Sequence, residues 1–145
     1  MRRDREWLAD AVELSRRCPP SETAFSVGAI LVSASGSVLA TGYSRETSPH
    51  DHAEEAALAK AGDFDPDGAT LYSSLEPCLR RVSRPVACAE LIVRSGVRRV
   101  VIAWREPPVF QPGGGAGWLE QQGVEVVDLP ELAEAAQAVN ERLLG

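Results

Sequence analysis

Three short stretches of the sequence carry side chains that together could bind a metal ion. They are His-Ala-Glu at residues 52–54, Pro-Cys at residues 77–78, and Cys88 further along the chain. One imidazole and two thiolates are a suitable ligand set for Zn²⁺, and three protein ligands leave the fourth tetrahedral position to water, as in catalytic zinc sites. We therefore predict that His52, Cys78 and Cys88 bind a zinc cofactor.

Glu54, two residues after the predicted histidine ligand, is the candidate catalytic residue. Bound Zn²⁺ lowers the pKa of its water, and the proton that the water releases needs an acceptor. A carboxylate at this position can take that proton and hand it to a substrate. A helix N-terminus stabilises a thiolate, which fits Cys88 at the start of a predicted helix.

Neighbouring residues leave alternatives open. His50 is a rival ligand, but it lacks the Ala-Glu that follows His52, so a place in a loop or pocket wall fits it better. We expect Asp51 to cap the helix N-terminus, and Glu55 to be a solvated charge in the first turn. Glu76 is expected to organise the turn that holds the second ligand.

Arg80, Arg81 and Arg84 lie between the two predicted cysteine ligands. They could form an ordinary solvated face. They could equally hold a substrate phosphate, because guanidinium groups match phosphate oxygens well. Arg45 is a weaker candidate for the same role.

The elements that must position these residues follow from the hydrophobic pattern and the Gly/Pro breaks. The pattern predicts helices at 7–18, 52–61, 88–95, 118–122 and 131–144, and strands at 25–32, 37–43, 69–74, 97–104 and 124–127. The first two strands flank a turn and should form an antiparallel hairpin, while strands that alternate with helices should pair in parallel. We expect an α/β protein with a mixed five-stranded sheet, its last three strands parallel, and helices on both faces. The loop at 107–115 reads as a lid or a simple connector.

Composition limits the possible functions. The 145 residues suit one domain, and 15 Lys and Arg against 21 Asp and Glu give a formal net charge of −6. An acidic chain is a poor candidate for binding long nucleic acid. No apolar run approaches the roughly 20 residues of a membrane span, and no secretory signal is visible, so the expected compartment is the cytoplasm.

The same motifs also resemble a known family. H-x-E, P-C and a second Cys are similar to the zinc-dependent nucleobase deaminases of the cytidine deaminase superfamily. Four further stretches resemble the pyrimidine deaminase domain of riboflavin biosynthesis, and they are TLYSSLEPC at 70–78, RRVVIA at 98–103, AFSVGA at 24–29 and TGYSR at 41–45. The resemblance implies a three-layer α/β/α cytidine-deaminase-like fold.

The resemblance also implies a function and a set of contacts. It implies hydrolytic deamination of a phosphorylated diaminopyrimidine, carrying a ribosylamino or ribitylamino group, by a homodimer or larger homo-oligomer. Because the chain ends where bifunctional relatives continue into a reductase, deamination alone is expected. The implied substrate-binding residues are Ser26, Gly28, Ala29, Arg45, His50, Glu76, Arg80, Arg81 and Arg84. Many bacterial relatives carry Asn-Pro before the Val-Gly, where this chain has Ala-Phe-Ser at residues 24–26.

Two alternatives remain beside this hypothesis. The nearer one is a cytosine, cytidine or (deoxy)cytidylate deaminase, whereas the acidic charge disfavours a tRNA adenosine deaminase. The other is a non-catalytic interaction module with a structural zinc. Glu54 disfavours the module, because a structural site has no use for a proton carrier.

Overall fold

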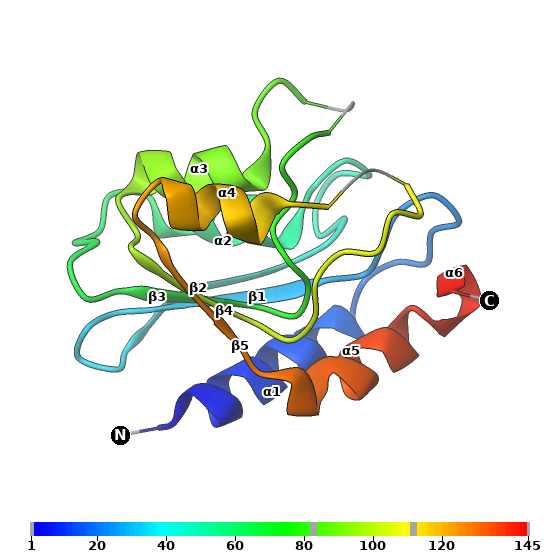
Figure 1. Cartoon of the computed structure of the whole chain (residues 1–145), viewed down its shortest axis with the longest axis horizontal. Helices are drawn as coiled ribbons and strands as arrows, with labels where there is room; N and C mark the ends of the chain where they lie inside the picture. The colour runs from blue at the N-terminus through cyan, green and yellow to red at the C-terminus, as the bar shows by residue number, and fades with distance from the viewer. Residues whose placement is uncertain (1, 82–83, 111–112, 145) are drawn as a thin grey trace.

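The computed structural model describes residues 2–81, 84–110 and 113–144, and its centre is one five-stranded sheet in the order β2-β1-β3-β4-β5 (Figure 1). The strands are β1 (Gly28–Val32), β2 (Val38–Tyr43), β3 (Thr70–Ser73), β4 (Arg99–Ile102) and β5 (Glu125–Asp128). β1 is antiparallel to both β2 and β3, while β3, β4 and β5 run parallel. The predicted hairpin and the predicted parallel strands are both confirmed.

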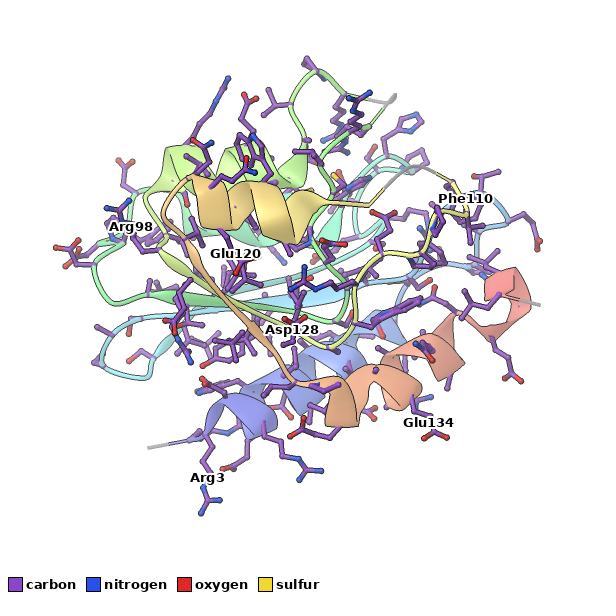
Figure 2. The ribbon with its side chains drawn as sticks, in the orientation of Figure 1. Arg3, Arg98, Phe110, Glu120, Asp128 and Glu134 are labelled. Carbon is purple, nitrogen blue, oxygen red and sulfur yellow. The ribbon has the colours of Figure 1, made fainter. Side chains whose placement is uncertain are left out.

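Helices cover both faces of the sheet, which confirms the expected three layers. α1 (Asp4–Ser15) and α5 (Ala133–Val139) lie on one face, and α2 (Ala53–Ala61), α3 (Cys88–Ser95) and α4 (Gly115–Gln121) lie on the other (Figure 1). On the outer side of the first layer, Arg3 and Glu134 project away from the sheet (Figure 2). In the part of the chain that the structure describes, no helix has the length and apolar character needed to cross a membrane.

Close contact between helices and strands fixes the position of α2. Gly42 on β2 faces α2 so closely that a Cβ atom there would lie 2.3 Å from the carbonyl oxygen of Ala53. Gly28 on β1 makes an equally tight contact with α1, where its Cβ would lie 2.0 Å from the oxygen of Ala11. Glycine is the residue that permits such backbone contact. The start of α2, where the predicted histidine ligand lies, is therefore set by the sheet.

The predicted closing helix at 131–144 is wrong in one respect, because the structure breaks it. A 3₁₀ turn, η1 (Pro130–Leu132), precedes α5, and a short α6 (Glu141–Leu144) follows it. The break lies at Asn140, whose buried side chain accepts a hydrogen bond from the backbone N–H of Ser26 at 2.6 Å and donates one to the Ser26 carbonyl at 3.0 Å. A side-chain amide that bonds to distant backbone competes with regular helix formation.

Candidate active site

His52, Cys78 and Cys88 come together in the structure. Their ligating atoms all lie within 4.8 Å of one another. The Nδ1 atom of His52 is 3.5 Å from the Sγ of Cys78 and 3.3 Å from the Sγ of Cys88. One nitrogen and two sulfur atoms converging in this way fit Zn²⁺, which prefers such ligands in a tetrahedral arrangement.

Helix and strand ends supply the three side chains. His52 is the N-cap of α2, Cys78 follows β3, and Cys88 is the first residue of α3. The backbone N–H of Cys88 donates to the Sγ of Cys78 at 3.2 Å, so the N-terminus of α3 is directed at this sulfur. Hydrogen bonding from the Cys88 thiol, with a further contribution from His52, lowers the pKa of Cys78 to about 4. The Cys78 thiolate is therefore favoured before a metal binds. The helix N-terminus does not have the expected effect on Cys88 itself, because its hydrogen bond with Cys78 and its burial raise the pKa of the Cys88 thiol.

Glu54 lies beside this cluster and is only 4% exposed. Burial raises the pKa of the Glu54 carboxyl to about 7, and the nearby Cys78 adds to the shift. A carboxyl group whose pKa lies near neutrality can both accept and donate a proton under physiological conditions.

A cavity of about 660 Å³ adjoins the cluster. Its size suits a small-molecule ligand. The rings of Phe25 and Phe110 form part of its wall and pack edge-to-face with their centroids 5.0 Å apart. Two of the predicted zinc ligands, His52 and Cys78, and the candidate catalytic residue Glu54 lie on its wall.

Four of the nine predicted substrate-binding residues line this cavity, namely Arg45, His50, Glu76 and Arg81. Ser26, Gly28, Ala29, Arg80 and Arg84 are not among the lining residues. Gly28 packs on α1 and Ala29 is fully buried within β1, so their positions serve the core. Phe25 and Val27, which precede them in the chain, do line the cavity.

Arg45 holds the cavity wall in place from a left-handed backbone conformation with φ of 59°. Its guanidinium donates to the carbonyl oxygens of Pro19 and Phe25 at 2.8 and 3.2 Å, and to the Oγ of Ser26 at 2.9 Å. The segment that carries Phe25 is therefore tied to the loop after β2.

The arginines between the cysteine ligands fit neither the expected solvated face nor the expected phosphate site fully. Arg80 is exposed, as a solvated face requires. Arg81 and Arg84 instead form ion pairs with acidic residues near His52. The expectation that Glu55 is a freely solvated charge is therefore wrong, because it pairs with both arginines at 3.3 and 3.1 Å.

The expectation that Asp51 caps α2 is also wrong. His52 is the N-cap, and its backbone N–H donates to Glu55 Oε1 at 3.3 Å. Asp51 Oδ2 accepts instead from the backbone N–H groups of Thr47 and Ser48 at 2.9 and 2.8 Å. Asp51 thus closes the turn that precedes the helix, and Glu55 supplies the reciprocal half of a capping box.

Glu76 organises the turn at Cys78, as its place in the sequence suggests. Its buried carboxylate accepts hydrogen bonds from the backbone N–H groups of Glu106 and Ala116 at 2.9 and 2.8 Å. The loop after β4 and the start of α4 are thereby attached to the turn. Sequence reasoning missed Phe110 on this loop, although an aromatic residue in a Pro/Gly-rich loop beside a predicted site was a usable signal.

Comparisons with known proteins agree with this geometry. Residues 1–104 match a sequence model described as the cytidine and deoxycytidylate deaminase zinc-binding region. A diaminohydroxyphosphoribosylamino-pyrimidine deaminase of Schizosaccharomyces pombe is 37% identical over 127 residues, which are 85% of this chain and 31% of that protein. The riboflavin biosynthesis protein RibD of Aquifex aeolicus is 36% identical over 95% of this chain and 38% of its own length.

A solved structure shows the same relationship. Acinetobacter baumannii RibD superimposes with a TM-score of 0.79 and 30% sequence identity, over 97% of this chain and 39% of that one. The chain thus spans about a third of the length of the curated relatives that it matches.

Proposed function

Because the chain belongs to the family defined by the cytidine and deoxycytidylate deaminase zinc-binding region, we propose that it is a zinc-dependent hydrolase that releases ammonia from a small aminopyrimidine. One observation carries the proposal. The His52, Cys78 and Cys88 ligand atoms converge beside the buried Glu54 on the wall of a ligand-sized cavity. A structural zinc site needs neither the carboxyl group nor the cavity.

The reaction replaces a ring C–NH₂ with C=O and consumes one water molecule. His52, Cys78 and Cys88 would hold Zn²⁺, which would supply a nucleophile at neutral pH by lowering the pKa of water. The Glu54 carboxylate takes the first water proton and delivers it to the ring nitrogen next to the attacked carbon. It then moves the second proton from the new hydroxyl to the amine. The C–N bond breaks, the carbonyl forms, and ammonia leaves.

The favoured substrate is a phosphorylated diaminopyrimidine with a ribosylamino or ribitylamino group. The name of the Schizosaccharomyces pombe relative, a diaminohydroxyphosphoribosylamino-pyrimidine deaminase, supports this class. The cavity offers the apolar rings of Phe25 and Phe110 to a pyrimidine, and Arg45 and His50 to an anionic group.

Ammonia release from a substrate panel tests the proposal. The zinc-loaded protein is incubated with diaminopyrimidine nucleotides, their dephosphorylated forms, cytosine, cytidine, dCMP and tRNA. We expect the highest kcat/KM on a diaminopyrimidine nucleotide. Faster turnover of cytidine or dCMP would select the alternative deaminase, and zinc binding without turnover of any compound would identify a non-catalytic module.

Phosphate recognition has its own test. We expect Arg45→Ala to lower kcat/KM on the phosphorylated substrate more than on its dephosphorylated form. Arg80→Ala is the comparison variant, because Arg80 is exposed and does not line the cavity. An unchanged ratio in every variant contradicts a phosphate contact.

We also propose that the protein works in the cytoplasm as a homodimer or larger homo-oligomer. The family resemblance supports assembly. Light scattering on the purified protein should then give a mass that is a multiple of the 15.6 kDa chain, and a mass of one chain contradicts this.

A further inference from the structure

We propose that four charged residues, Asp51, Glu55, Arg81 and Arg84, form an ionic clasp that positions the histidine ligand against the two cysteine ligands. In this clasp Glu55 and Arg84 are positioning residues for the metal site. The proposal rests on the zinc site described above and concerns what holds its ligands ready.

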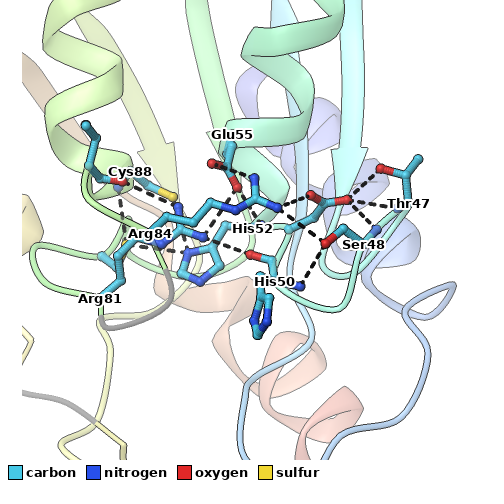
Figure 3. Close-up of polar contacts among 11 residues, drawn as sticks. Thr47, Ser48, His50, His52, Glu55, Arg81, Arg84 and Cys88 are labelled. Atoms are coloured by element: carbon cyan, nitrogen blue, oxygen red, sulfur yellow. Dashed lines mark hydrogen bonds and ion pairs between the residues drawn. The ribbon is translucent and has the colours of Figure 1, made fainter.

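Arg84 connects the two sides of the histidine ligand (Figure 3). One guanidinium nitrogen, Nη2, lies 3.2 Å from Asp51 Oδ1, and the other, Nη1, lies 3.1 Å from Glu55 Oε2. Asp51 comes directly before His52 and Glu55 comes in the first turn after it. A planar guanidinium is well suited to bridge two carboxylates in this way.

Arg81 holds the backbone on the same stretch. Its Nη2 donates to the carbonyl oxygen of His50 at 2.8 Å and lies 3.3 Å from Glu55 Oε1. The same Glu55 oxygen accepts the backbone N–H of His52 at 3.3 Å. Glu55 therefore links the peptide of the histidine ligand to an arginine of the segment between the cysteines.

The burial of the clasp makes these contacts specific. The Arg81 side chain is 3% exposed and that of Glu55 is 17% exposed. The Nε of Arg81 is buried without a hydrogen-bond partner among the described residues, so the guanidinium is held through its Nη groups. Removing the partner of a buried charge is costly, so the clasp favours one arrangement of its segments.

The clasp joins parts of the chain that are far apart in sequence. Both arginines lie in the segment between Cys78 and Cys88, and both acids flank His52. Two positive and two negative charges balance, so the segments attract each other without an external ion. The ligands are then brought together before the metal arrives, and residues that orient metal ligands in this way typically contribute about 10- to 100-fold to metal affinity.

Zinc affinity of Arg84 variants tests the proposal. Arg84 is 34% exposed and does not line the cavity, so its substitution leaves the lining residues in place. The zinc dissociation constant is measured by chelator competition in the full chain, and the visible absorption of the Co²⁺-substituted protein reports ligand geometry. We expect Arg84→Ala to weaken zinc binding about 10- to 100-fold and to alter the Co²⁺ spectrum. Arg84→Lys should recover part of the affinity.

A matched control separates this effect from general loss of an ion pair. Arg94→Ala removes an exposed pair with Glu90 on α3, the helix that begins at Cys88, and it should bind zinc as the wild type does. Equal affinities for Arg84→Ala and the wild type overturn the clasp, and so do equal losses in Arg84→Ala and Arg94→Ala.

Glu55→Gln keeps the experiment decisive if Arg84→Ala fails to fold. The glutamine keeps an oxygen for the His52 N–H but loses the charge that pairs with both arginines. We expect weaker zinc binding with circular dichroism unchanged, and wild-type affinity overturns the clasp. Failure of the wild type to bind zinc would instead overturn the proposed function.

Discussion

Two adjacent glutamates show how the surroundings of a residue set its chemistry. Glu54 and Glu55 share the first turn of α2. Burial raises the pKa of Glu54 to about 7. Burial acts in the same direction on Glu55, but the His52 N–H and the charge of Arg81 outweigh it and lower the pKa of Glu55. One carboxyl group is thereby suited to carry protons and the other to stay ionised as a fixed partner.

Glu54→Gln should separate proton transfer from metal binding. The amide has nearly the shape of the carboxyl group but cannot accept the water proton. We expect kcat to fall by about 10²- to 10⁴-fold, with zinc content near that of the wild type. Ammonia release and elemental analysis on the same sample measure both quantities. A kcat within tenfold of the wild type would show that another group carries the proton.

Helix ends and their contacts with neighbouring turns control the site at the scale of elements. α4 begins at Gly115, where a Cβ atom would lie 1.9 Å from the carbonyl oxygen of Pro77 in the ligand turn. Two residues later, a Cβ on Gly117 would meet nothing within 4 Å. Substituting each glycine by alanine therefore compares a position in close backbone contact with an open position on the same helix.

Gly115→Ala should destabilise the protein, because its methyl group must displace the backbone beside Cys78. Overpacking of this kind costs about 1–3 kcal/mol, and zinc affinity should fall with it. Gly117→Ala should raise the free energy of unfolding by up to about 1 kcal/mol, since alanine is the better helix former. Urea unfolding of both variants measures the difference. Similar stabilities for the two would contradict the close contact.

A second element contact joins α1 to the middle of the sheet and makes stability depend on pH. Asp4 Oδ1 accepts a hydrogen bond from the Tyr72 hydroxyl at 2.6 Å and one from Arg99 Nη1 at 2.9 Å. These hydrogen bonds, chiefly those from Arg99, hold the pKa of Asp4 below its ordinary value of 3.8 although burial opposes the shift. The ionised form therefore stabilises the folded state above pH 3.8, and the contribution is lost as pH falls through the lowered pKa.

Asp4→Asn should lower the free energy of unfolding by about 1 kcal/mol at pH 7, a modest value because the pair is partly exposed. The difference from the wild type should shrink as pH falls below 3.8, the ordinary pKa of the group. Urea unfolding across this pH range measures it. Asp10→Asn is the control, since Asp10 pairs with the exposed Arg2, and should have a smaller effect at pH 7. A constant difference at every pH would contradict the assignment to Asp4.

At the scale of the whole molecule, a bound metal would connect distant parts of the chain. The three ligands come from the start of α2, the turn after β3 and the start of α3. A ligand that binds only the folded state stabilises it by mass action. Metal binding and global stability should therefore change together.

The reference is protein in free zinc at a concentration a thousand times the zinc dissociation constant. Removing the zinc should lower the free energy of unfolding by about 4 kcal/mol from that reference. Calorimetry with and without a chelator measures the effect. Cys88→Ser should abolish the dependence on zinc. Cys18→Ser should keep it, because the Cys18 thiol donates to the Val27 carbonyl at 3.4 Å and does not belong to the ligand cluster that the described residues form. Equal zinc dependence in both variants would contradict the ligand set.

Much of the fold and of the metal site could be predicted from local patterns. Alternating apolar runs and Gly/Pro breaks indicated five strands and the parallel pairing of the last three. The types and spacing of His52, Glu54, Cys78 and Cys88 indicated zinc chemistry. The same patterns could not place β1 between β2 and β3, nor the break at Asn140, whose partner Ser26 lies at the other end of the chain.

The amino-acid types and their local periodicity thus established which groups could bind zinc and carry a proton, because ligand chemistry and strand propensity are properties of short segments. Folding in three dimensions decided which charges face one another. Arg81 and Arg84 read as a solvated face or a phosphate site until the segment between the cysteines was placed against Asp51 and Glu55. Charges near the surface interact strongly only when they are close, because salt and water screen more distant ones. The outcome of ion pairing therefore depends on contacts between segments that the linear order does not reveal.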